Sequence, residues 1–253
     1  MPNPRNRQNE VKIFCLRVRS QAFFMEEKMK KLLSVLLVLT MLVCFAACGE
    51  KEAPKGPGAT VTIVKAGEVQ VAAEFVEFKD YDQDGKYNID EVLKAAHEAL
   101  HPDKDAAYAS ADLGYGLSMT KLWGEETMST GYYLNDQMAW SLLDEVKDGD
   151  YVAAFVYSDA VGFSDTYAFF DKKNADGKKV DLVLSMLGFD ENWAPAVSTL
   201  EGAVITVDGK ATEIKTDAAG KASVEVSGSE SHIISAVKDG VVLVAPVCVV
   251  TVK

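Results

Sequence analysis

Residues 88–102 read NIDEVLKAAHEALHP, which is the longest helical pattern in this part of the chain. The runs around it resemble strands, so this stretch distinguishes an α+β fold from an all-β one. Asn88 and Glu91 have the spacing of a capping box, and Pro102 ends the pattern. The apolar residues of the helical period are Ile89, Val92, Leu93, Ala96 and Leu100. We therefore predict a helix over 88–100 beside strands, which makes this part of the chain α+β.

Strand-like runs lie on both sides of this helix. Apolar and polar residues alternate before it over 60–71 and 75–78. After it, strand patterns cover 115–122, 131–134, 151–157 and 165–170. Apolar residues at helical spacing over 138–146 predict a second, short helix. We expect one α+β domain over 60–175, with its boundary in the polar loop 171–178 (DKKNADGK).

The pattern changes to short strands separated by turns beyond residue 180. The strand-like runs are 180–187, 203–207, 211–216, 222–226, 233–237 and 241–252. This regular spacing predicts a small antiparallel β-sandwich of immunoglobulin-like shape over 176–253. Residues 202–210 (GAVITVDGK) and 216–222 (TDAAGKA) resemble bacterial surface repeat domains of Ig-like or carboxypeptidase-regulatory type. Such a resemblance implies a spacer or an adhesion module.

Three motifs in the first domain carry a second resemblance: the helix 89–100, GYYLND at 131–136 and VKDGDYV at 146–152. Over 60–171 the chain resembles a transcobalamin C-terminal-like domain, which implies a β-grasp-like fold. In vertebrate relatives this domain closes over cobalamin together with a large helical domain. Without that partner domain, the resemblance suits a glycan, peptide or protein ligand at least as well. The candidate ligand contacts, each of which also suits the core, are Trp123, Tyr132, Tyr133, Asn135 and Trp140.

A targeting segment precedes both domains. Residues 29–48 read MKKLLSVLLVLTMLVCFAAC, with two lysines, an apolar run and small residues before Cys48. This stretch resembles a bacterial lipobox, so we expect a lipoprotein signal peptide over 29–47 and a lipid on Cys48. A transmembrane anchor is the alternative, for which the apolar run is short of the roughly 20 residues that a span needs.

The chain on either side of this signal has two further interpretations. Residues 1–28 are interpreted as a mis-called start, with translation beginning at Met29. Residues 48–59, rich in Gly, Pro and charge, are expected to form a flexible tether between the lipid and the first domain. The protein would then lie outside the cytoplasm, anchored by lipid to the bacterial cell membrane.

The charge of the mature chain narrows the range of partners. Residues 1–47 hold eight of the 26 Lys and Arg and three of the 38 Asp and Glu, so 18 basic and 35 acidic residues remain. The resulting formal charge of −17 is the opposite of the basic surface that nucleic acids bind, so we expect no nucleic-acid partner.

Residues 80–91 (DYDQDGKYNIDE) match the twelve positions of an EF-hand loop. Alternating oxygens on such a loop converge on one hard cation, and Gly85 permits the turn. The expected calcium ligands are Asp80, Asp82, Asp84, the Lys86 carbonyl, Asn88 and Glu91. The alternative is an acidic strand-to-helix turn in which Asn88 and Glu91 only cap the helix.

Residues 97–101 read HEALH, a match to the HExxH motif of zinc peptidases. In that chemistry His97 and His101 bind zinc and Glu98 acts as the base. The buried helical stripe leaves the two histidines toward its edge, and the third ligand would have to be a residue such as Glu125 or Glu126, around which no specific pattern lies. The leading prediction is therefore a non-enzymatic, lipid-anchored binding or adhesion protein. A zinc metallopeptidase and a solute-capture lipoprotein remain the rivals.

Overall fold

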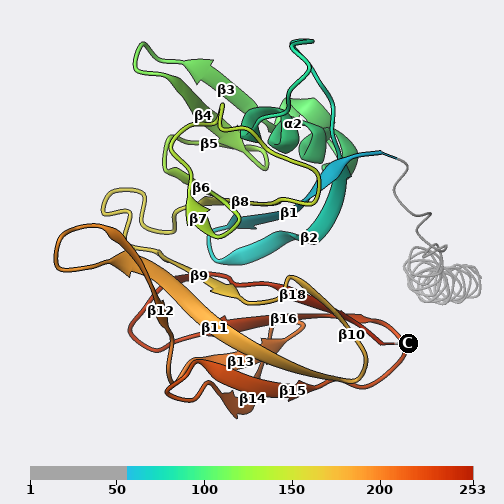
Figure 1. Cartoon of the computed structure of the whole chain (residues 1–253), viewed down its shortest axis with the longest axis vertical. Coiled ribbons are helices and arrows are strands. Elements are labelled where there is room, and N and C mark those ends of the chain that lie inside the picture. Colours follow the sequence, from blue (N-terminus) through green and yellow to red (C-terminus); the bar gives the residue numbers. More distant parts are fainter. Residues whose placement is uncertain (1–55, 253) are drawn as a thin grey trace, which may run out of the picture. The chain divides into compact units, whose positions relative to one another are not determined.

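The computed structural model describes residues 56–252, which belong to one compact unit built mostly of β-strands (Figure 1). The interpretations of residues 1–28, 29–47 and 48–55, including Cys48, lie outside the described residues. Within the described part, no helix has the length and the apolar character needed to cross a membrane.

The first sheet has the strand order β2-β1-β8-β6-β7, with helix α2 packed against it (Figure 1). Its central pair is parallel, with Thr60 opposite Tyr151, and its other pairs are antiparallel. The strands are β1 (Gly58–Lys65), β2 (Glu68–Glu77), β6 (Thr130–Leu134), β7 (Gln137–Met138) and β8 (Tyr151–Val156). Since β1 begins at Gly58, the last two residues of the predicted tether belong to this sheet.

The predicted helix is confirmed as α2 (Ile89–Leu100). The Asn88 side chain accepts the Glu91 N–H, and the Glu91 side chain accepts the Asn88 N–H, so both halves of the capping box are present. Leu93 and Ala96 are fully buried in the hydrophobic core that α2 shares with strands β1, β2 and β8. The helix is thus held both by its cap and by its apolar stripe.

The segments that flank the first sheet are short. The 3₁₀ helix η1 (Lys104–Ala107) leads into a small sheet of β3 (Ala109–Asp112), β4 (Leu117–Leu122) and β5 (Glu125–Glu126). The prediction of a helix over 138–146 is wrong. Leu142 and Val146 are buried there, but the backbone bonds run to the start of α2, where Asp90 N–H meets Leu142 O and Ile89 N–H meets Asp144 O. Apolar spacing alone could not reveal these partners.

The rest of the chain forms two further sheets, with orders β12-β11-β9-β17 and β10-β18-β16-β13-β14, and β15 pairs with β11 (Figure 1). The strands are β9 (Thr166–Phe170), β10 (Asn174–Asp176), β11 (Lys179–Phe189), β12 (Pro195–Thr199), β13 (Val204–Val207), β14 (Lys210–Lys215), β15 (Lys221–Glu225), β16 (Ser231–Val237), β17 (Leu243–Val244) and β18 (Cys248–Thr251). Five of the six predicted runs are confirmed as strands, whereas the run 241–252 divides into the short strands β17 and β18, and β10 and β12 were not predicted.

Two of these pairs correct the prediction of a purely antiparallel second domain. Strand β10 runs parallel to β18, and β17 runs parallel to β9. Parallel pairs join strands that are distant along the chain, and the turn spacing in the sequence reports only hairpins between neighbours. Strand β9, which precedes the predicted boundary at 171–178, pairs with β11 beyond it.

A buried aromatic cluster joins the first sheet to the β9–β11 sheet. Tyr133 of β6 stacks on Tyr167 of β9 with ring centroids 3.8 Å apart. Beside them, Lys173 Nζ lies 2.8 Å from the Asp136 carboxylate and 4.5 Å from the centre of the Tyr151 ring. Both charged side chains are largely buried, with 16% and 18% of their surface exposed. The Tyr167 hydroxyl donates to the same carboxylate at 2.9 Å.

Candidate metal centre

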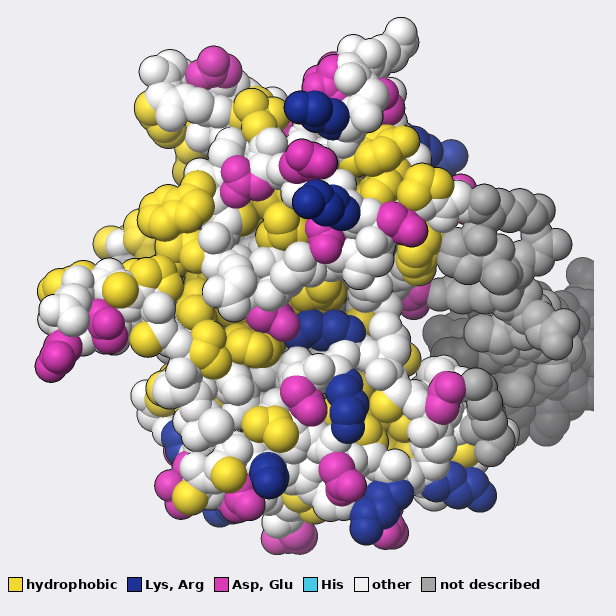
Figure 2. All heavy atoms as spheres, viewed as in Figure 1, with side chains coloured by type: hydrophobic (Ala, Val, Ile, Leu, Met, Phe, Trp, Pro, Cys, Tyr) yellow, Lys and Arg dark blue, Asp and Glu magenta, His cyan; other side chains and the backbone are white. Residues whose placement is uncertain are grey.

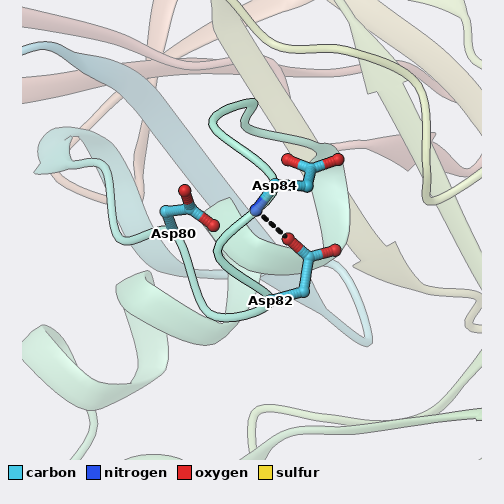
Figure 3. Close-up of side chains that lie close together, drawn as sticks. All are labelled: Asp80, Asp82 and Asp84. Atoms are coloured by element: carbon cyan, nitrogen blue, oxygen red, sulfur yellow. Dashed lines mark hydrogen bonds between the residues drawn. The ribbon is translucent and has the colours of Figure 1, made fainter.

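Three carboxylates converge on the loop between β2 and α2. The ligand oxygens of Asp80, Asp82 and Asp84 all lie within 4.8 Å of one another, as the close-up in Figure 3 shows. Two left-handed residues, Gln83 (φ 62°) and Gly85 (φ 81°), turn the chain tightly between them. These are the first, third and fifth positions of the predicted calcium loop, and the structure brings them together.

Hydrogen bonds to the loop's own backbone explain this convergence. The Asp80 carboxylate accepts the N–H groups of Gln83 at 2.6 Å and Gly85 at 2.9 Å. Asp82 accepts the Asp84 N–H at 3.1 Å, drawn as a dashed line in Figure 3, and Asp84 accepts the Lys86 N–H at 2.7 Å. Each aspartate thereby forms a local turn that keeps its carboxylate close to the other two.

Asn88 and Glu91 have other partners. One Glu91 oxygen accepts the Tyr81 N–H at 2.7 Å and the other accepts the Asn88 N–H at 3.3 Å. Only 5% of Glu91 is exposed, and it closes the loop onto the helix start. The structure therefore does not bring these two residues into the aspartate cluster, while the Lys86 carbonyl stays a predicted ligand.

The three carboxylates suit a hard, oxygen-binding cation. Their negative charges repel one another at this separation, and a cation relieves that repulsion. Calcium takes six to eight oxygens, so water and backbone carbonyls would complete the shell around three aspartates. Since Asp82 and Asp84 are exposed, affinity is expected in the weak range of about 10⁻⁴ to 10⁻³ M, typical of extracellular modules.

The sequence predicted that His97 of the HExxH match lies at the edge of the buried stripe. That prediction is wrong, because His97 is fully buried. Its Nδ1 lies 2.6 Å from the Leu93 carbonyl oxygen, and its Nε2 lies 3.0 Å from the Trp123 backbone N–H. The Trp123 N–H must donate, so Nε2 is the acceptor and Nδ1 carries the proton. Burial lowers the pKa of His97 to about 4. Zinc binding would break one of these two bonds.

The other two residues of the motif are also occupied. Glu98 binds Lys79 at 2.7 Å, and this hydrogen bond lowers the pKa of the Glu98 carboxyl. His101 accepts the Asp103 N–H at 3.0 Å and packs edge-on against Trp123. Among residues 56–252, Asp80, Asp82 and Asp84 form the only cluster of three metal-binding side chains, so the histidines have no third ligand there.

The predicted ligand-binding residues do not form one surface. Trp123 and Tyr132 pack against the core around α2, and Tyr133 lies in the stack with Tyr167. Asn135 binds Asp150 and accepts the Tyr151 N–H, so its amide is structural. Trp140 alone of the five is strongly exposed, at 82%. The sequence allowed either ligand contact or packing against the core for Trp123, Tyr132 and Tyr133, and the structure shows packing.

The sequence reasoning missed a second set of exposed aromatics. Phe163, Phe189 and Trp193 are exposed at 52%, 55% and 82%, in the loop before β9 and in the β11–β12 hairpin. Figure 2 shows hydrophobic side chains, in yellow, gathered on the visible face. The available signal was a pair of short acidic turns, SDAVGFSD at 158–165 and DENWAP at 190–195, each of which contains an aromatic residue.

Comparison with known proteins adds no further constraint. No protein-family model, curated protein or solved structure matches this chain. The aspartate loop, the occupied histidines and the exposed aromatics are therefore the features of the described residues that bear on function.

Proposed function

We propose that this chain is a lipid-anchored, extracytoplasmic binding or adhesion protein, non-enzymatic, in which calcium stabilises the corner between β2 and α2. One observation carries the proposal: oxygens of Asp80, Asp82 and Asp84 lie within 4.8 Å of one another on an exposed loop. The lipobox-like stretch ending at Cys48 and the formal charge of −17 support an extracellular setting.

The proposed fold families agree with this role. Helix α2 packed on a mixed sheet with a parallel central pair, β1 and β8, supports a β-grasp-like first domain related to the transcobalamin C-terminal-like family. The two sheets that follow support an Ig-like surface module, with the parallel pairs as a departure from that pattern. Because one fold hosts many functions, the binding role itself rests on the aspartate loop and the occupied histidines.

The state of His97 favours a binding protein over a zinc peptidase. Both imidazole nitrogens are engaged by backbone groups in the core, and Glu98 is paired with Lys79. A catalytic zinc site needs three protein ligands and an open position. A zinc-peptidase function would therefore require the helix and the Trp123 turn to rearrange. A change in stability on adding zinc would reveal such a rearrangement.

A groove supports the second candidate, capture of a solute. It has a volume of about 710 Å³ and lies between the β1–β2 turn and strands β13 and β16. Val69, Ile233 and Val242 line it with Asp208 and Lys238, a mixture suited to a small amphipathic molecule. Native mass spectrometry of the protein from its own cells tests this role, with added cobalamin as a second probe. Val242→Trp would fill the groove, so this variant should lose the added mass of any small molecule that stays bound to the unchanged protein.

Thermal unfolding tests the calcium proposal. Protein spanning residues 49–253 would be heated in chelator, in millimolar calcium and in micromolar zinc. A cation that binds only the folded state adds RT ln(1 + [L]/Kd), about 1.4 kcal/mol at ten times Kd. We expect a calcium-dependent rise in Tm that Asp82→Asn and Asp84→Asn abolish, since Asn keeps the turn while removing the charge.

The matched control is Asp217→Asn, because Asp217 forms the same kind of turn by accepting the Ala219 N–H at 2.9 Å, outside the cluster. This variant should keep the calcium response. A response that survives Asp82→Asn, or no response at all, contradicts the calcium site. A zinc response lost in His97→Gln would instead restore the peptidase.

Lipid labelling tests the anchor separately. Cells fed an alkyne-bearing fatty acid should label the full chain and leave Cys48→Ser unlabelled. The unlabelled variant should leave the membrane fraction, because a covalent lipid supplies about 0.8 kcal/mol for each buried methylene. Equal membrane association of the two proteins would favour the transmembrane alternative.

A further inference from the structure

Five apolar side chains are exposed at one end of the β12-β11-β9 sheet. Their exposed fractions range from 51% to 89%, and the residues are Val161, Phe163, Phe189, Trp193 and Val197. Soluble surfaces carry single exposed apolar residues routinely, but a group of this size on neighbouring loops marks an interaction site.

The strand register places these residues together. Ala168 of β9 pairs with Met186 of β11 in antiparallel fashion, so the loop that enters β9 lies where β11 ends. At that end β11 continues into the turn 190–194 and returns as β12, with Gly188 opposite Ala196. Phe163 therefore comes from one connection, and Phe189 and Trp193 from the adjacent hairpin. The two connections lie on the same side of the sheet in Figure 1.

Backbone bonds hold both connections in an unusual conformation. Phe163 (φ 50°) and Trp193 (φ 61°) are left-handed, a backbone conformation that bulky residues rarely adopt. The Asp159 carboxylate accepts three hydrogen bonds, from Val161 N–H, Gly162 N–H and the Ser164 hydroxyl. In the hairpin, Asp190 accepts the N–H groups on either side of Trp193, at 2.8 and 2.9 Å. These hydrogen bonds thus hold Phe163 and Trp193 in an unfavourable backbone conformation in which their rings are exposed to water.

The charged residues within these two connections are all acidic. The two connections contain Asp159, Asp165, Asp190 and Glu191, and neither 158–165 nor 189–197 contains a Lys or Arg. Anionic lipid headgroups and anionic polymers are repelled by such a border. An ammonium or guanidinium group is attracted both by the carboxylates and by the face of the Trp193 ring.

We propose that this end of the sheet, defined by Val161, Phe163, Phe189, Trp193 and Val197, docks a cationic apolar peptide segment. Lys or Arg side chains of the segment meet the acidic border and the Trp193 face, and its apolar side chains cover the other exposed rings. The inference rests on the proposed extracellular binding role for its setting only. Its residues are separate from the aspartate loop.

Fluorescence anisotropy with a defined probe tests this docking surface. The probe is a dye-labelled octapeptide of alternating Lys and Leu, and its counterpart carries Glu in place of Lys. We expect the Lys peptide alone to bind, with affinity that falls as NaCl rises from about 50 mM to about 0.5 M. Trp193→Ala should weaken binding by about tenfold and Glu191→Gln by about threefold.

The matched control is Trp140→Ala, since Trp140 is equally exposed, at 82%, but lies on the β7–β8 connection. This variant should bind the Lys peptide like the unchanged protein, and so should Asp82→Asn, which separates this test from the calcium test. Equal losses in Trp140→Ala and Trp193→Ala overturn the proposal. So does Trp193-dependent binding of cellohexaose or of phosphatidylglycerol vesicles without binding of the Lys peptide.

Discussion

His97 shows how one buried side chain joins two distant parts of the backbone. Its imidazole spans from the Leu93 carbonyl within α2 to the Trp123 N–H at the end of β4. The ring also lies between Tyr108 and Trp123, with centroids 5.0 and 5.3 Å away. The neutral ring donates to the Leu93 carbonyl and accepts the Trp123 N–H, so both imidazole nitrogens are paired inside the core.

Acid should weaken the fold through His97. Its pKa is about 4 in the folded protein against an ordinary value of 6.5, so the unfolded chain binds a proton first. Its contribution is complete above pH 6.5 and declines as pH falls toward 4. Between pH 7.5 and 5 we expect His97 to account for a loss of about 2 kcal/mol in the free energy of unfolding. Urea denaturation at both pH values measures it.

His97→Gln is the informative variant, because an amide offers one donor and one acceptor without titrating near neutrality. It should remove most of that pH dependence. An unchanged pH dependence in His97→Gln would show that the imidazole is not held neutral in the core.

The HExxH spacing was visible in the sequence, but its meaning was not. Positions i and i+4 place His97 and His101 on one side of a helix, as the motif requires. The decisive partner of His97 is a backbone N–H 26 residues away, in a turn where Trp123 has φ 48°. No local pattern encodes that contact, so the sequence placed the histidine at the edge of the stripe.

At the scale of elements, the cap of α2 and the aspartate loop are adjacent but distinct. Asn88 and Glu91 stabilise the start of the helix, and Asp80, Asp82 and Asp84 form the cluster before it. The EF-hand pattern predicted all of these as ligands of one ion. The spacing alone could not decide whether Glu91 is a calcium ligand or part of the helix cap. Position 12 of an EF-hand loop is also the third residue of the helix that follows.

Two substitutions separate these roles. Asn88→Ala should lower the free energy of unfolding by about 1 kcal/mol through loss of the cap. Glu91→Gln should keep the calcium-dependent rise in Tm, because the carboxylate is occupied by Tyr81 and Asn88 N–H groups. Denaturant melts and thermal scans with and without calcium provide both values. Loss of the calcium response in Glu91→Gln would make Glu91 a ligand after all.

At the scale of the whole molecule, the contacts between the first sheet and the β9–β11 sheet hold the described part together. Val64 and Phe155 from the first sheet share a hydrophobic cluster with Tyr167, Leu187 and Val244. The Lys173–Asp136 pair lies beside this cluster. Burial lowers the pKa of Lys173, and the adjacent Asp136 carboxylate opposes that effect.

Removing Lys173 should be costly. Lys173→Met leaves the largely buried Asp136 carboxylate without its cation, and we expect a loss of about 2–3 kcal/mol in the free energy of unfolding. The matched control is Lys79→Met, which breaks the exposed pair with Glu98 and should cost less than about 1 kcal/mol. Urea denaturation compares them, and equal costs would show that the Lys173 pair does not hold the layers together.

Local features of the fold were predictable, and long-range ones were not. The helix, its cap and most strands follow from periodicity and turn residues, and the aspartate cluster follows from the loop motif. The parallel pairs β10–β18 and β17–β9 and the Lys173–Asp136 contact link residues tens of positions apart. Such pairings depend on tertiary packing, which a single sequence does not report.

Terbium luminescence reports whether Asp80, Asp82 and Asp84 bind a cation. Tb³⁺ replaces calcium at oxygen sites, and Tyr81, between Asp80 and Asp82, and Tyr87, three residues after Asp84, can transfer excitation to it. We predict sensitised emission that millimolar calcium displaces, that Asp82→Asn and Asp84→Asn abolish, and that Asp217→Asn retains. Emission that is absent, or equally strong in Asp82→Asn, would contradict a metal site in this loop.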